Sequence, residues 1–151
     1  MTKSSTEQIE CPSCQAPQTM AIFHSINADL NPALREKLMT EGGVNIFTCG
    51  NCNCRALVHA PLLYHDMRRR YCVQFLPPEW LEDAASLDAH DREGRMRDIG
   101  GMSGESYVLQ PHIVFSMEEM VRYILFRELL DARDRLEKDT EEITRHQERP
   151  K

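Results

Sequence analysis

Two short motifs, CPSC at residues 11–14 and CGNC at residues 49–52, decide how this chain folds. The tight turn of a CxxC motif directs two sulfurs toward one metal ion, and two such pairs complete a tetrahedral shell of four thiolates. Residues 15–48 separate the pairs, which is longer than in compact zinc modules. A closed excursion of this length adds little loop-closure entropy. The sequence therefore predicts one structural zinc ion bound by Cys11, Cys14, Cys49 and Cys52.

The segments around the motifs predict a small antiparallel sheet with an inserted helix. Residues 19–28 (TMAIFHSINA) and 44–48 (VNIFT) alternate as strands, and 31–43 (NPALREKLMTEGG) carries the start and stop signals of a helix. Residues 55–66 and 69–76 alternate as the two strands of a hairpin that turns near Asp66 and Met67. These patterns predict an α+β fold resembling a zinc ribbon.

The ends of the chain and one long connection carry weaker patterns. Residues 1–10 are polar and aperiodic, so we expect a disordered lead-in, and 84–106 has the composition of a mobile loop. Residues 107–115 (YVLQPHIVF) resume a strand pattern. Ser116 and Glu119 form a capping box that starts a long C-terminal helix. We expect one domain over 11–130, followed by a charged helical extension over 131–151.

Composition narrows the class of protein. The 151 residues carry a net charge of −6, and most of the acidity follows residue 75. The sequence lacks a long apolar run and an apolar N-terminal stretch, so we expect a cytoplasmic protein that does not bind membranes. A reducing compartment favours metal ligation over disulfides for these cysteines. The HExxH, GxSxG and P-loop motifs are missing, and we expect no enzymatic activity.

Four phrases of the sequence resemble the CpXC family, a prokaryotic group of presumed zinc-binding domains. They are CPSC, SINADLNPALREKLMTEGGVNIFTC with the following CGNC, APLLYHDM, and the C-terminal HIVFSMEEMVRYILFRELLD. The resemblance covers about residues 11–130 and implies that the four cysteines of the two CxxC pairs are ligands. It implies no established activity. The sequence departs from the usual knuckle pattern at Gln15 and Asn53, where zinc knuckles commonly place glycine for a positive φ.

Residues outside the four-cysteine set leave several functions open. Cys54 is either a half-buried small residue or a redox thiol that could form a disulfide with a ligand and expel zinc, whereas Cys72 fits a core strand. A basic patch at the hairpin tip could contact nucleic acid; its residues are Arg55, Arg68, Arg69 and Arg70.

The C-terminal helix offers the stronger candidate for a partner surface. Its apolar residues extend beyond a single stripe, through Tyr123, Phe126, Leu129 and Leu130. This surface could bind another protein or a second copy of the chain. The sequence therefore favours a non-enzymatic zinc module that acts as an adaptor or regulator through protein contacts, with nucleic-acid binding or a zinc–thiolate redox switch as alternatives.

Overall fold

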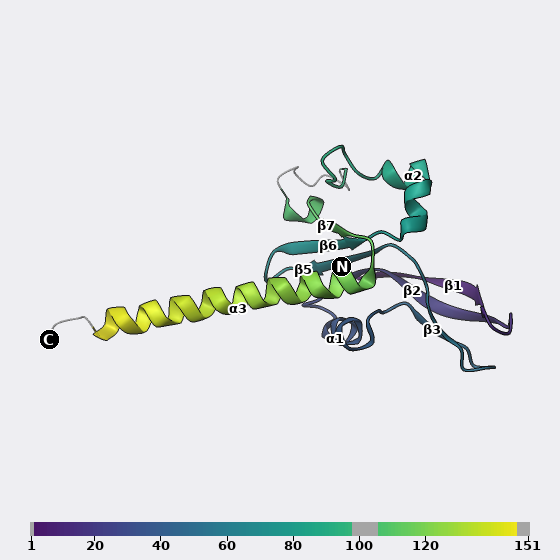
Figure 1. Cartoon of the computed structure of the whole chain (residues 1–151), viewed down its shortest axis with the longest axis horizontal. Helices are drawn as coiled ribbons and strands as arrows, with labels where there is room; N and C mark the ends of the chain where they lie inside the picture. Colours follow the sequence, from purple (N-terminus) through teal and green to yellow (C-terminus); the bar gives the residue numbers. More distant parts are fainter. Residues whose placement is uncertain (1, 98–105, 148–151) are drawn as a thin grey trace.

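The computed structural model describes residues 2–97 and 106–147, which form an α+β domain with a long helix at one side (Figure 1). A five-stranded sheet has the order β1-β2-β5-β6-β7, and β3 and β4 form a separate two-stranded sheet. The elements are β1 (Lys3–Glu10), β2 (Pro17–Asn27), α1 (Pro32–Glu41), β3 (Ile46–Thr48), β4 (Arg55–Leu57), β5 (Leu62–Asp66), β6 (Tyr71–Phe75), η1 (Pro78–Glu82), α2 (Ala84–Leu87), η2 (Tyr107–Leu109), β7 (His112–Val114) and α3 (Met117–Gln147).

The α+β class is confirmed, and β1–β2, β3–β4 and β5–β6 are antiparallel pairs as expected, but the main sheet as a whole is not purely antiparallel. The main sheet is mixed, because β2 pairs with β5 and β6 pairs with β7 in parallel. The parallel β6–β7 pair forms because the excursion after Pro77 carries the chain back to the starting end of β6. Residues 107–115 supply only a short strand here, since η2 occupies residues Tyr107–Leu109 before β7 begins.

The expectation of a disordered lead-in over residues 1–10 is also wrong. Residues Lys3–Glu10 form β1, which pairs with β2 in antiparallel register from Lys3↔Ser25 to Glu10↔Pro17. Most side chains of β1 are exposed, so the strand has no hydrophobic alternation that sequence reasoning could detect. Its partner is β2 from Pro17 to Ser25, and β1 covers that edge of β2.

The main core lies between the sheet and the two longer helices. Fully buried side chains come from β2, α1, β5, β6 and α3, and include Ile26, Leu38, Tyr64, Val73 and Ile124. The helix signals in the sequence are confirmed: α1 has a proline in its first turn and ends at Gly42, which has a φ of 72°. The capping box at α3 also forms, because Glu119 N donates to Ser116 Oγ (3.1 Å) and Ser116 N donates to the Glu119 carboxylate (3.2 Å).

The region expected to be a mobile loop contains regular structure where it is described. Residues Ala84–Leu87 form α2, and a turn at Gly94 brings His90 and Met96 into a β-bridge. The rest of that expected loop, residues 98–105, lies outside the described residues.

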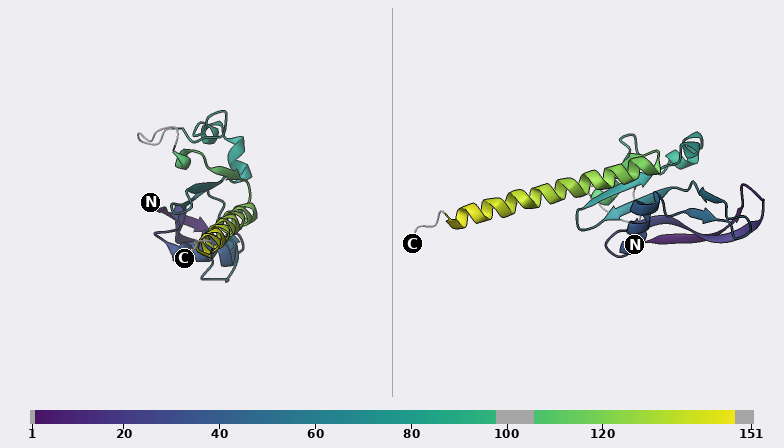
Figure 2. Two further views of the ribbon diagram at one scale, coloured as in Figure 1. Left: turned by 90° about the vertical axis from the view of Figure 1, so that its left-hand side faces the viewer. Right: turned by 60° about the horizontal axis from the view of Figure 1, so that its bottom comes forward.

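The second half of α3 runs clear of the domain, as two further views also show (Figure 2). Described side chains from Ala132 onward are exposed, so the prediction of a charged helical extension is confirmed as far as Gln147. Over residues 2–97 and 106–147, no helix combines the length and apolar character needed to cross a bilayer.

Candidate metal centre

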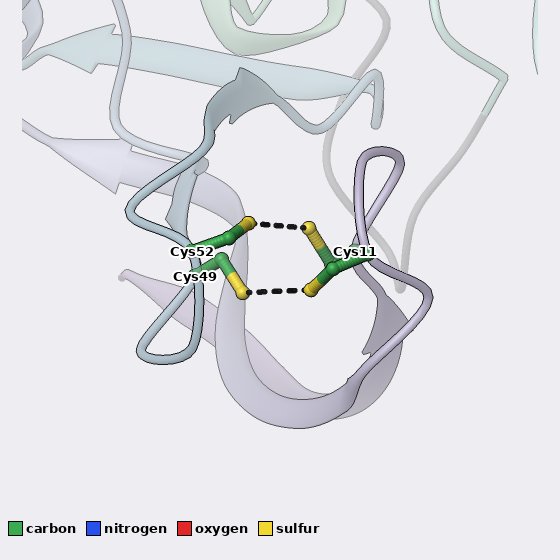
Figure 3. A group of neighbouring side chains, drawn as sticks. Cys11, Cys49 and Cys52 are labelled. Atoms are coloured by element: carbon green, nitrogen blue, oxygen red, sulfur yellow. Dashed lines mark hydrogen bonds between the residues drawn. The ribbon is translucent and has the colours of Figure 1, made fainter.

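The four cysteines of the two CxxC pairs converge on one point. Their sulfurs all lie within 4.8 Å of one another. The Sγ atoms of Cys11 and Cys52 are 3.6 Å apart, as are those of Cys14 and Cys49, and Figure 3 shows the labelled members facing one another. Zinc–sulfur bonds of about 2.3 Å at tetrahedral angles place sulfurs about 3.8 Å apart. The cluster therefore fits one tetrahedral metal ion bound by four thiolates.

Two equivalent backbone turns position these sulfurs; we call residues 11–16 the first knuckle and 49–54 the second. In the first, Gln15 N donates to Cys11 O (2.9 Å) and Cys11 N donates to Ala16 O (3.0 Å). In the second, Asn53 N donates to Cys49 O (2.9 Å) and Cys49 N to Cys54 O (2.8 Å). Gln15 and Asn53 adopt φ values of 60° and 57°. Gln15 and Asn53 therefore have a left-handed backbone conformation at the positions where zinc knuckles commonly have glycine.

Backbone and side-chain N–H groups donate hydrogen bonds to the sulfurs. Ser13 N donates to Cys11 Sγ (3.4 Å), Asn51 Nδ2 to Cys14 Sγ (3.5 Å) and Gln18 Nε2 to Cys49 Sγ (3.2 Å). Gln18 also accepts from Gly50 N through Oε1 (3.2 Å), so one amide from β2 secures the second knuckle. Such donors stabilise thiolate charge and orient the ligands. Sequence reasoning missed Gln18 and Asn51, because neither belongs to a ligand motif.

The pKa values of the cluster's thiols show that neighbouring thiolates compete for negative charge. The Cys14 backbone N–H lowers the pKa of Cys11 to about 6, and the Asn51 amide lowers the pKa of Cys14. The Cys54 backbone N–H favours the Cys52 thiolate, but desolvation and the other three thiols outweigh it and raise the pKa of Cys52 to about 12. One thiol of the group ionises readily and another resists, as expected when like charges crowd together without a cation. A divalent cation would remove this conflict.

The other two cysteines lie outside the ligand set. Cys54 is half-buried and packs against a small core formed by Cys11, Phe47 and Cys49. Desolvation raises the pKa of Cys54, which opposes rapid oxidation of its thiol. Cys72 is buried in β6 of the main sheet, opposite His65, as a core position should be.

The four arginines of the expected basic patch do not come together. Arg55 belongs to β4, beside the second knuckle, and pairs with Glu41. The other three lie at the β5–β6 turn, next to the opposite end of β2, where Asn27 pairs with His65. Of these, Arg68 is exposed, and Arg70 lies over the ring of Tyr107 at 5.0 Å.

Arg69 binds acidic side chains of the domain. Its guanidinium pairs with Asp66 (2.8 Å) and Asp131 (3.0 Å), and lies 3.9 Å from Glu128. The side chain of Arg69 is only 16% exposed. Its charge is therefore committed to holding α3 against the hairpin, a role that the contiguous arginine run did not reveal.

Three of the four expected partner residues on α3 lie together, because Tyr123, Phe126 and Leu130 line one pocket beside Arg69 and Asp131. Tyr123 is half-buried and stacks on His112, with ring centroids 3.8 Å apart. Phe126 and Leu129 are 54% and 70% exposed, whereas Leu130 is half-buried. The exposed apolar surface continues instead from Leu129 along the free part of the helix.

Fold and site together define an α+β domain with a four-cysteine cluster suited to a metal ion. The family described as CpXC protein matches residues 9–142, nearly the whole chain. The chain therefore belongs to the CpXC family, and the resemblance seen in the sequence is confirmed. No curated protein and no solved structure matches it.

Proposed function

We propose that the chain is a structural zinc-binding module that acts without catalysis, as an adaptor or regulator through contacts with protein. The observation that carries the metal half is the convergence of four thiols at tetrahedral spacing. Four thiolates fill the coordination shell of zinc and leave no position for a reacting water, which is the arrangement of a structural site.

The packing around the cluster explains what the metal would stabilise. The small core beside it contains three buried residues, of which Cys11 and Cys49 are themselves ligands and Phe47 is the third. So little apolar surface cannot hold two knuckles together. Zinc binding would supply that free energy and join the β1–β2 ribbon to the β3–β4 hairpin.

Protein contacts fit the surface better than nucleic-acid contacts. The chain carries a net charge of −6, and zinc held by four thiolates adds negative charge beside Arg55. Arg69 is already paired with carboxylates. Exposed apolar side chains on α3, such as Leu129 and Leu136, are instead typical of a protein interface.

The metal half is tested by measuring zinc content and local stability. We expect about one zinc per purified chain, and we expect Cys49→Ser to lose it. Cys54→Ser is the matched control, because this neighbouring thiol lies outside the ligand set, and it should retain zinc. Hydrogen exchange should show loss of protection at both knuckles in Cys49→Ser and retained protection in β5 and β6. A metal-free protein with protected knuckles would refute the proposal.

The adaptor half is tested by capture of partners from the native cell, with and without nuclease. Protein partners that persist after nuclease treatment, and that a substitution of Leu129 removes, would support it. Partners that depend on nucleic acid would favour the alternative function instead.

A further inference from the structure

An apolar stripe runs along one flank of α3, from the part that packs on the domain into the part that extends beyond it. Met120 and Ile124 of the same helix are fully buried against the core. Leu125, Leu129 and Leu136 lie on a flank of the helix, with exposed fractions of 46%, 70% and 68%. The stripe consists of Leu125, Leu129, Ala132, Leu136 and Ile143, all exposed.

The spacing of the stripe is that of a helix-pairing seam. Leu129, Leu136 and Ile143 recur every seven residues, and Leu125 and Ala132 occupy the intermediate positions of the same repeat. Apolar residues in this heptad pattern place one side chain per turn on the line where two helices meet. The second half of α3 extends beyond the domain (Figures 1 and 2), so a second helix can reach Ala132, Leu136 and Ile143 there, and Leu125 and Leu129 are exposed where the first half packs on the domain.

We propose that a second copy of this chain covers the stripe, with the two α3 helices antiparallel. When Leu129 of one copy faces Ala132 of the other, Leu125 faces Leu136 by the same register, and the two-fold axis repeats each contact. Ile143 then faces Glu118 in the first turn of the other helix, where the Glu118 side chain is 72% exposed. This pairing buries the leucines of the stripe on both copies and leaves no leucine of the stripe opposite a charge.

Charge complementarity selects this register and direction. Arg122 precedes the stripe by one turn, pairs with Glu118 of its own helix (2.6 Å) and is 74% exposed as a side chain. In this register it also faces Asp139 of the second copy. A parallel pair would instead place Asp139 against Asp139 and Arg122 against Arg122. Shifting the antiparallel register by one heptad would place Asp139 against Leu129. The opposite shift would place Glu118 against Leu136. Of these arrangements, only the proposed register pairs Arg122 with Asp139 and keeps the leucines of the stripe away from charges.

The position of the domain permits this arrangement. The stripe lies about a third of a turn around α3 from Met120 and Ile124, which pack into the core. Each domain would therefore lie on the outer side of its own helix, and the two helices would meet between them. This inference names one partner for the protein contacts proposed above, but it requires no metal.

Sedimentation equilibrium of the zinc-loaded full chain tests the pairing. We expect a concentration-dependent dimer, and Leu136→Glu should weaken it by about a hundredfold or more, because two leucines lose their burial per dimer. Lys138→Glu is the matched control, because it introduces a glutamate on the other side of the helix, and it should leave the dimer intact. Retained zinc in each variant separates this result from a failure of the metal site. A monomeric wild-type chain would overturn the proposal and would leave the stripe to a different protein. A dimer that survives Leu136→Glu would overturn it as well.

A charge exchange tests the direction of the helices. Asp139→Arg should weaken an antiparallel dimer about tenfold, because it meets Arg122 of the other copy at both ends. The double variant Arg122→Glu with Asp139→Arg should restore the wild-type dissociation constant. In a parallel dimer each residue faces its own copy, so neither the single nor the double exchange would have this effect. A dimer insensitive to Asp139→Arg would overturn the antiparallel assignment.

Discussion

Replacing Arg69 with alanine should destabilise the domain, whereas replacing the adjacent Arg68 should not. The Arg69 guanidinium donates to Asp66 Oδ2 (2.8 Å) and to Asp131 Oδ2 (3.0 Å). The side chain of Asp66 is only 2% exposed. The alanine variant would leave this carboxylate buried beside the core without its cationic partner.

The magnitude follows from that burial. Breaking one side of a buried ion pair costs about 3–5 kcal/mol. Arg69 retains some solvent contact, with 16% of its side chain exposed, and its backbone N–H would still donate to Asp66 Oδ1. We therefore expect Arg69→Ala to lower the free energy of unfolding by about 2–3 kcal/mol. Arg68 is exposed at the same turn, so Arg68→Ala should change it by less than about 0.5 kcal/mol.

Urea denaturation of the two variants measures the difference, with an unchanged m-value as the sign that the folded state is the same. A second variant distinguishes the unpaired charge from lost packing. Combining Arg69→Ala with Asp66→Asn removes the buried charge, so the double variant should be more stable than Arg69→Ala alone. Equal stability of Arg68→Ala and Arg69→Ala would refute the reasoning, because it would mean that the ion pairs of Arg69 do not stabilise the domain.

Three further predictions concern the metal centre and the core. Gln18→Ala removes the N–H donor to Cys49 Sγ and should weaken zinc affinity by about tenfold or more in a competition with a chromophoric chelator; unchanged affinity would contradict the role of Gln18. Gln15→Gly relieves a left-handed φ of 60° and should raise the free energy of unfolding of the zinc-bound form by about 1 kcal/mol in urea denaturation; a loss of stability would contradict the strain. Burial raises the pKa of Cys72 from 9.0 and of Tyr64 from 10.0, each to about 12. The unfolded chain loses these protons at lower pH than the folded chain, so these groups should not affect the urea midpoint below about pH 9 and should lower it as the pH rises toward 12. Cys72→Val should reduce this dependence of the midpoint on pH. An identical dependence in the variant would contradict the role of Cys72.

The four-cysteine cluster could be predicted from sequence because its signal is local and chemical. Each CxxC pair needs only its own turn to aim two sulfurs, so spacing alone identified Cys11, Cys14, Cys49 and Cys52. The same holds for the start of α3, where the capping box depends on residues within one helical turn.

The rest of the site depended on contacts between distant segments. Gln18 reaches the second knuckle only because β2 begins beside it, and Arg69 meets Asp131 only after α3 crosses the β5–β6 turn. Strand β1 was missed because its exposed polar side chains carry no period, although its backbone pairs with β2 along its length. Such features follow from tertiary arrangement, and a pattern of residue types within one segment does not encode them.

The segment between the knuckles explains why the stability of the domain need not depend on metal binding at the cysteine cluster. Leu38 of α1 and Val44 after it are buried in the main core, and Arg35 pairs with Glu128 of α3. This segment therefore stays anchored by apolar burial and an ion pair whether or not a metal is bound. Loss of the metal would release the knuckles at the start of β2, while α1 would remain packed against the sheet and α3. The long separation of the two CxxC pairs thus places α1, which is packed into the main core, between them in the sequence. For the same reason, pairing through the stripe on α3 should persist in a protein stripped of its metal.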